Sequence, residues 1–234
     1  MSGCSKCKSA ADVKINVLKY CNQCFLSFFE LKVQRNLHKL HSNSSILIYL
    51  SDSPSSLVAI EFLNKTLSGR KFKKLCIFCR NSLLFKTSIQ FVDAEFSPEN
   101  EYSLKRQSSD VIQYCLENSY DVLLYAESMN QAITGSLLLL CKGQGLDAVS
   151  YCSRNQYDSL NIVNIFEGVK QKEISYYLYL KGINDIDAKP RDVLKNKDIP
   201  VRVVIDKFIS KLDEKNELAV FNIKNTFKKL YKSE

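Results

Sequence analysis

Four cysteines near the start of the chain have a spacing typical of a metal site. They form two Cys-x2-Cys pairs, Cys4 with Cys7 and Cys21 with Cys24, with thirteen residues between the pairs. Each pair supplies two thiolates, and four thiolates complete the tetrahedral shell that Zn²⁺ prefers, with no open position for catalysis. So short a segment cannot bury a core of its own, so a metal would have to order it. We expect structural zinc here; chance clustering and redox chemistry are the alternatives.

The other five cysteines lie among apolar neighbours, and we expect them to be core residues rather than iron–sulfur ligands. Cys76 and Cys79 belong to the run LCIFC, which reads as a buried strand. Residues i and i+3 of a strand point to opposite faces, so these two thiols cannot easily share a metal. The same expectation holds for Cys115, Cys141 and Cys152. Nine cysteines in such a chain also argue against a disulfide framework, because the reducing cytosol would not maintain one.

A possible phosphate loop follows the apolar run ILIYL at residues 46–50. The turn after it consists of Ser51, Asp52, Ser53, Pro54, Ser55 and Ser56, and an amphipathic helix then begins. Strand, loop and helix form the layout in which backbone N–H groups bind phosphates. Here glycines are absent, Asp52 would place a negative charge beside the phosphates, and Pro54 lacks an N–H group. Pro54 also suits the first position of a helix, with Ser53 as its cap.

The chain is basic at its two ends. Its net charge is +8, and residues 1–45 hold seven Lys or Arg against two Asp or Glu, while residues 191–234 hold eleven against seven. Residues 25–41 are predicted to form a helix with Lys32, Arg35 and Lys39 on one face, opposite its apolar side. These three side chains are candidates for contacts to an RNA backbone. A solvated helix face is the alternative.

Apolar strands and amphipathic helices alternate through the middle of the chain. The predicted strands span 46–50, 74–79, 87–92, 121–126 and 160–165, and the predicted helices span 55–67, 110–118, 131–141, 172–181 and 201–212. This alternation indicates an α/β fold with a parallel sheet and helices on both faces. We expect a zinc unit with a basic helix (1–44), an α/β domain (45–189) and a helical C-terminal segment (190–234). The sequence shows neither a membrane-spanning run nor a signal peptide, which predicts a cytoplasmic protein.

Four stretches, in matching order, resemble one family. CSKCK and CNQCF are similar to the N-terminal zinc unit of the eukaryotic tRNA wobble-thiolation proteins, and SDSPSS is similar to the ATP-pyrophosphatase loop Ser-Gly-Gly-x-Asp-Ser. LLYAESMNQAITGSLLLLCKGQG, with Ala126-Glu127 in place of Gly-Asp, and the helix containing Lys172, Glu173, Ile174 and Tyr177 resemble two further motifs. Across roughly residues 4–232, the chain therefore resembles the cytoplasmic tRNA 2-thiolation protein two family. Family members usually continue into a further cysteine-bearing region.

The resemblance implies an ATP-pyrophosphatase-like fold and a role in 2-thiolation of the wobble uridine of cytosolic lysine, glutamine and glutamate tRNAs. Family members form a heterodimer with the active thiolase, which takes sulfur from a thiocarboxylated ubiquitin-like carrier; conjugation of that carrier to proteins (urmylation) is linked to the pathway. The loop here lacks both glycines and the magnesium-binding aspartate. We therefore expect a tRNA-binding, non-catalytic subunit without ATP or an iron–sulfur cluster. An active adenylating enzyme with a non-standard loop and a zinc scaffold without an RNA role are the alternatives.

Overall fold

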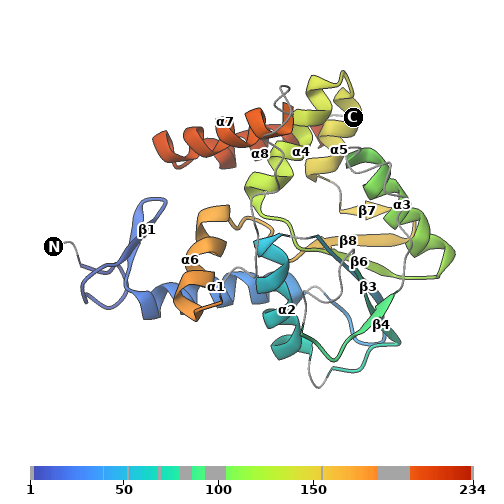
Figure 1. Cartoon of the computed structure of the whole chain (residues 1–234), viewed down its shortest axis with the longest axis horizontal. Helices are drawn as coiled ribbons and strands as arrows, with labels where there is room; N and C mark the ends of the chain where they lie inside the picture. Colours follow the sequence, from blue (N-terminus) through green and yellow to red (C-terminus); the bar gives the residue numbers. More distant parts are fainter. Residues whose placement is uncertain are drawn as a thin grey trace, which may run out of the picture.

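A computed structural model describes most of the 234-residue chain, namely residues 3–38, 40–51, 53–67, 70–79, 86–92, 104–153, 155–183 and 201–232. Figure 1 shows an α/β body with a small unit at the N-terminus and a layer of helices near the C-terminus. Within the described residues, no helix combines the length and the apolar character needed to cross a membrane.

The body is built on a six-stranded sheet. Its strands are β3 (Ser45–Leu50), β4 (Lys74–Cys79), β5 (Gln90–Val92), β6 (Val122–Tyr125), β7 (Gln156–Tyr157) and β8 (Leu160–Asn164). They lie in the order β5-β4-β3-β6-β8-β7, and all neighbours are parallel except β7, which pairs with β8 as a short antiparallel edge. The carboxyl ends of β3, β6 and β8 therefore meet at one edge, where ligands bind in open parallel sheets.

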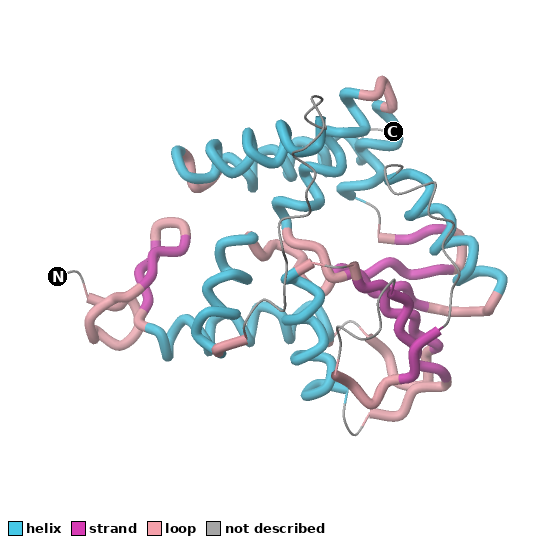
Figure 2. Tube along the Cα trace, in the orientation of Figure 1, coloured by secondary structure: helices cyan, strands magenta, loops and turns pink. Residues whose placement is uncertain are grey.

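Helices cover both faces of this sheet, as the alternation of elements predicts (Figure 2). On one face, α1 (Asn22–Leu37), α2 (Pro54–Leu67) and α6 (Gln171–Lys181) share a core with the inward residues of β3, such as Ile46 and Ile48. On the other face, α3 (Leu104–Glu117) packs against Leu47 of the same strand. Successive residues of β3 thus enter different cores, which explains its continuous apolar sequence.

A separate helical layer extends beyond the carboxyl edge of the sheet. It consists of α4 (Met129–Cys141), α5 (Gly145–Ser153), α7 (Val201–Lys215) and α8 (Ala219–Lys232), which share one apolar cluster around Met129, Ile209 and Val220. In Figure 1, α7 and α8 lie side by side over α4 and α5. The sequence predicts helical structure here, whereas the break between α7 and α8 at residues 216–218 and the helix α5 are new observations.

The N-terminal unit contains a small antiparallel hairpin that the sequence does not predict. Strands β1 (Val13–Ile15) and β2 (Leu18–Tyr20) pair across a turn in which Asn16 has a φ of 53°. Asparagine tolerates this left-handed conformation better than most residues. Tyr20 is buried and stacks on Phe28 of α1, with ring centroids 5.0 Å apart. The hairpin is therefore joined to the body through α1.

Candidate functional site

The four N-terminal cysteines converge in the structure as their spacing predicts. Their sulfur atoms all lie within 4.8 Å of one another, and Cys7 and Cys21 are 3.5 Å apart. A tight turn brings the first pair round, with the Cys4 N–H donating to the Ser9 carbonyl oxygen at 2.6 Å. The second pair stands at the start of α1, where Cys21 precedes the first helical residue. Four soft thiol ligands at this separation are a donor set that can hold a metal ion.

The environment of the cluster divides its thiols into two kinds. Hydrogen bonds from backbone N–H groups, first that of Cys21, lower the pKa of Cys4 to about 6 although burial opposes this shift. The pKa of Cys24 is raised to about 12, first because of its hydrogen bonds with Cys7 and Cys21 and then because of burial. Negative charge is thus favoured at one sulfur and disfavoured at its neighbour. The positive charge of a bound cation stabilises neighbouring thiolates, so thiols that coordinate it lose their protons.

Within the described part of the chain, the five other cysteines do not gather into a second metal group. Cys76 and Cys79 are buried on opposite faces of β4, Cys76 with the α3 core and Cys79 with the α2 core, as predicted. Cys115 and Cys152 are also buried. The prediction for Cys141 is wrong, because this residue is exposed at the end of α4. Its apolar neighbours in the sequence suggest burial, but its position on the helix faces solvent.

The serine-rich loop after β3 is closed by its own hydroxyl groups. Ser53 Oγ lies 2.9 Å from Ser51 Oγ, 2.7 Å from Ser55 Oγ and 3.3 Å from Ser56 Oγ. Ser55 is fully buried and donates to the carbonyl oxygen of Ala126, at the end of β6, over 2.8 Å. Helix α2 begins at Pro54, as its sequence position predicts. Asp52 lies outside the described residues.

A half-buried polar cluster lies beside this loop, around Glu127. Glu127 lies two residues after the end of β6, and both of its carboxylate oxygens accept from the Tyr151 hydroxyl, at 3.0 and 3.2 Å. Asn164, the last residue of β8, holds the backbone of Glu127 in place by two hydrogen bonds. Burial raises the pKa of Glu127, although the bond from Tyr151 and the charge of Arg202 act in the opposite direction.

Glu127 lines a cavity of about 70 Å³ between the sheet edge and the C-terminal helices. Glu167 lines it too, and its Oε1 atom accepts from Lys224 Nζ at 2.8 Å and from Lys228 Nζ at 2.9 Å. Burial alone would raise the pKa of Glu167, but the two ammonium groups outweigh it and lower the pKa. One of the stretches that resemble the family contains Glu127, but neither Glu127 nor Glu167 was predicted as a site residue. The signal was an acid shortly after a buried strand, where parallel sheets place their ligand-binding residues.

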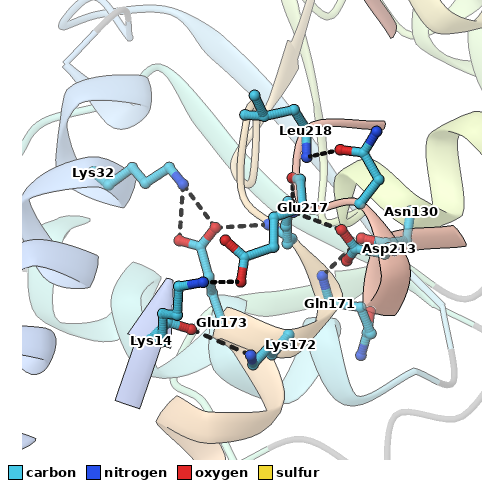
Figure 3. A network of polar contacts seen from close by, with 11 residues as sticks. Lys14, Lys32, Asn130, Gln171, Lys172, Glu173, Asp213, Glu217 and Leu218 are labelled. Carbon is cyan, nitrogen blue, oxygen red and sulfur yellow. Dashed lines mark hydrogen bonds and ion pairs between the residues drawn. The ribbon is translucent and has the colours of Figure 1, made fainter. Parts of the chain in front are cut away.

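The three basic candidates of α1 have different environments. Lys32 Nζ forms an ion pair with Glu173 of α6 at 2.8 Å, and Glu173 is fully buried (Figure 3). Arg35 is exposed, and Lys39 lies outside the described residues. The Lys32 side chain is therefore held by an ion pair within the protein, whereas Arg35 lies at the surface.

The ion pair of Lys32 belongs to a larger polar network at the junction of three parts of the chain (Figure 3). Lys14 of the hairpin pairs with Glu217 at 3.1 Å, and Lys172 donates to the Lys14 carbonyl oxygen. Lys170, buried at the start of α6, pairs with Asp213 of α7. The cysteine unit, α6 and the C-terminal helices thus meet at one place.

A solved structure resembles this chain over nearly its whole length. No family model and no curated protein matches the chain. Among solved structures, the U34-tRNA thiolase NcsA from Methanococcus maripaludis, solved with its [4Fe-4S] cluster, superposes with a TM-score of 0.72 at 13% sequence identity. The match covers 98% of this chain and 88% of the thiolase chain. The α/β fold of this protein, with its mostly parallel six-stranded sheet, is therefore similar to the fold of NcsA.

Proposed function

We propose that the protein is a non-catalytic subunit for 2-thiolation of the wobble uridine of cytosolic lysine, glutamine and glutamate tRNAs. It binds tRNA and completes a heterodimer with a thiolase that receives sulfur from a thiocarboxylated ubiquitin-like carrier. The observation that carries the proposal is the combination of a thiolase-like fold with a loop whose hydroxyls bond to one another. The four sequence stretches that resemble the family point the same way.

The loop is unsuited to nucleotide phosphates for three reasons. It has no glycine among residues 51–56, so side chains occupy the space through which phosphates approach backbone N–H groups. Pro54, its first helical residue, has no N–H to donate. Ser55, which stands where the related loop has aspartate, is buried and bonded to Ala126, and so is no magnesium ligand.

For the cysteine cluster, zinc is the metal that the sulfur positions favour. Sulfurs at the corners of a tetrahedron around one zinc ion lie about 3.8 Å apart, given zinc–sulfur bonds of about 2.3 Å. All sulfur pairs here are within 4.8 Å. The thiolates of a four-iron cluster bind different corners of a cube and stand farther apart. Zinc bound here would order the hairpin and the start of α1, with no part in catalysis.

Deletion and loop variants together test the proposal. Deleting the gene should abolish wobble 2-thiolation, measured by retardation of the tRNAs in mercury-containing gels, and the wild-type chain should restore it. Ser51→Ala and Ser56→Ala should also restore it, because these hydroxyls hold no nucleotide. The chain should co-purify with its thiolase partner.

Two results would contradict the proposal. Thiolation that persists without the protein removes it from the pathway. Thiolation lost in the alanine variants, together with ATP binding or tRNA-dependent pyrophosphate release by the isolated chain, assigns an active adenylating site to the loop instead.

A further inference from the structure

The last described helix, α8, combines a basic composition with an outer side rich in hydrogen-bonding groups. Residues 219–232 contain four lysines and no acidic residue. One side of the helix, with Val220 and Phe227, is buried in the C-terminal cluster. Another side presents Asn222, Asn225, Thr226, Lys228 and Lys229 around open space. This side of the helix therefore combines hydrogen-bonding groups with positive charge.

The charge on this surface is only partly neutralised by the neighbouring acid. Lys224 and Lys228 share a single carboxylate oxygen of Glu167, so the three side chains together carry one excess positive charge. The Lys224 side chain is only 6% exposed and Lys228 is 44% exposed. Lys224 thus keeps Glu167 paired whether or not Lys228 stays in contact, and Lys228 can turn toward a ligand without leaving the carboxylate unpaired.

We infer that this face of α8 binds the phosphate backbone of RNA. Lysine, asparagine and threonine side chains are common partners of phosphate oxygens, and these contacts position a nucleic acid without reading its sequence. Tyr231, 41% exposed on the next turn, offers a ring on which an unpaired base can stack. That the RNA is a tRNA rests on the proposed function. The surface lies at the opposite end of the sequence from the basic residues of α1.

The experiment measures binding of a lysine tRNA transcript to the zinc-loaded full-length chain by fluorescence anisotropy over a salt series. The double variant Lys228→Gln/Lys229→Gln should weaken binding about tenfold per lost phosphate contact near 0.1 M salt and reduce the slope of log K against log salt by about 2. The control is Lys211→Gln/Lys215→Gln, which removes the same charge from exposed positions of α7. Equal losses in the two double variants, or no loss in the first, would overturn the inference.

Glu167 provides an independent test, because it restrains Lys228. Glu167→Gln should tighten RNA binding by a few fold, and this gain should vanish in Glu167→Gln/Lys228→Gln. If Glu167→Gln tightens binding by the same factor when Lys228 is already replaced by glutamine, overall charge alone is responsible. That result contradicts a contact by Lys228. Urea unfolding of each variant identifies any loss that arises from misfolding.

A competition experiment distinguishes a surface that binds RNA from one that binds protein. Binding by the wild-type chain separates failure of this inference from failure of the proposed function. If poly-glutamate competes with the tRNA for α8 as effectively as a second RNA does, the face binds acidic proteins. That result would overturn the inference. Normal tRNA binding by the α8 double variant refutes the surface but leaves the proposed function standing. A wild-type chain that binds no tRNA, and that thiolation does not require, refutes the proposed function itself.

Discussion

At the scale of single residues, Lys32 shows how a side chain's role depends on its partner. Its ammonium group lies against Glu173, which is fully buried and also accepts from the Lys170 N–H at 3.1 Å. Arg35, one turn farther along the same helix, is exposed. If a Lys32 variant loses tRNA affinity, the loss can therefore come from lower stability as well as from a lost RNA contact. An Arg35 variant tests the RNA contact alone.

We expect Lys32→Met to lower the free energy of unfolding by about 3 kcal/mol, because it leaves a buried carboxylate without its cation. Arg35→Ala should change it by less than about 0.5 kcal/mol. Urea unfolding measures both, and Lys32→Met/Glu173→Gln should recover part of the loss. Similar stabilities of the two single variants would show that the ion pair contributes little.

Glu127 and Glu167 should affect stability in opposite directions as pH changes. The raised pKa of Glu127 means that the folded state binds its proton more tightly, so its contribution falls as pH rises from the unfolded pKa through the folded one. The lowered pKa of Glu167 gives a contribution that is present above the unfolded pKa and is lost as pH falls through the folded one.

Unfolding free energies of Glu127→Gln and Glu167→Gln across acid and neutral pH check this expectation. Relative to wild type, Glu127→Gln should gain stability as pH rises toward neutral, and Glu167→Gln should lose it over the same rise. Parallel pH curves for wild type and both variants would mean that neither carboxyl has a shifted pKa.

At the scale of elements, the close approach of α4 to α5 depends on Gly135. A Cβ atom built there would lie 2.5 Å from Cε1 of Tyr151, the residue that donates to Glu127. Gly135→Ala should therefore destabilise the protein by about 1–2 kcal/mol, because overpacking exceeds the gain in helix propensity. Gly145→Ala, at the start of α5 with no atom within 4 Å of its added Cβ, is the matched control. Thermal unfolding of the two variants checks this, and equal midpoints would refute the close contact.

The sequence predicts elements well where one physical pattern is strong. Strand β3 is a continuous apolar run between two polar turns, and its observed bounds differ from the predicted ones by one residue. The hairpin β1–β2 escaped prediction because its strands have three residues each and alternate with lysines. The cysteine quartet was predicted because its ligands are close in sequence. Pairs such as Lys32 with Glu173, 141 residues apart, arise only from the folded topology.

At the scale of the whole molecule, the cysteine unit is a small appendage to a larger body. Ile15 and Tyr20 join the core shared with α1, and Lys14 links the hairpin to Glu217 near α8. The other face of the sheet and the C-terminal helices have cores without residues of this unit. Folding of the unit should therefore depend on its metal, whereas folding of the body should not.

Metal removal tests this division. Chelation, or Cys7→Ser, should release one zinc per chain and expose Lys6, Lys8, Lys14 and Lys19 to trypsin, because ligand loss unfolds the segment before α1. Mass spectrometry should then find a resistant fragment that begins near residue 20 and keeps the cooperative unfolding of the sheet. Cys141→Ser, which alters an exposed thiol outside the cluster, should keep both the zinc and the intact chain. Protected N-terminal lysines after chelation would mean that the hairpin folds without metal, and collapse of the whole chain would mean that the sheet depends on it.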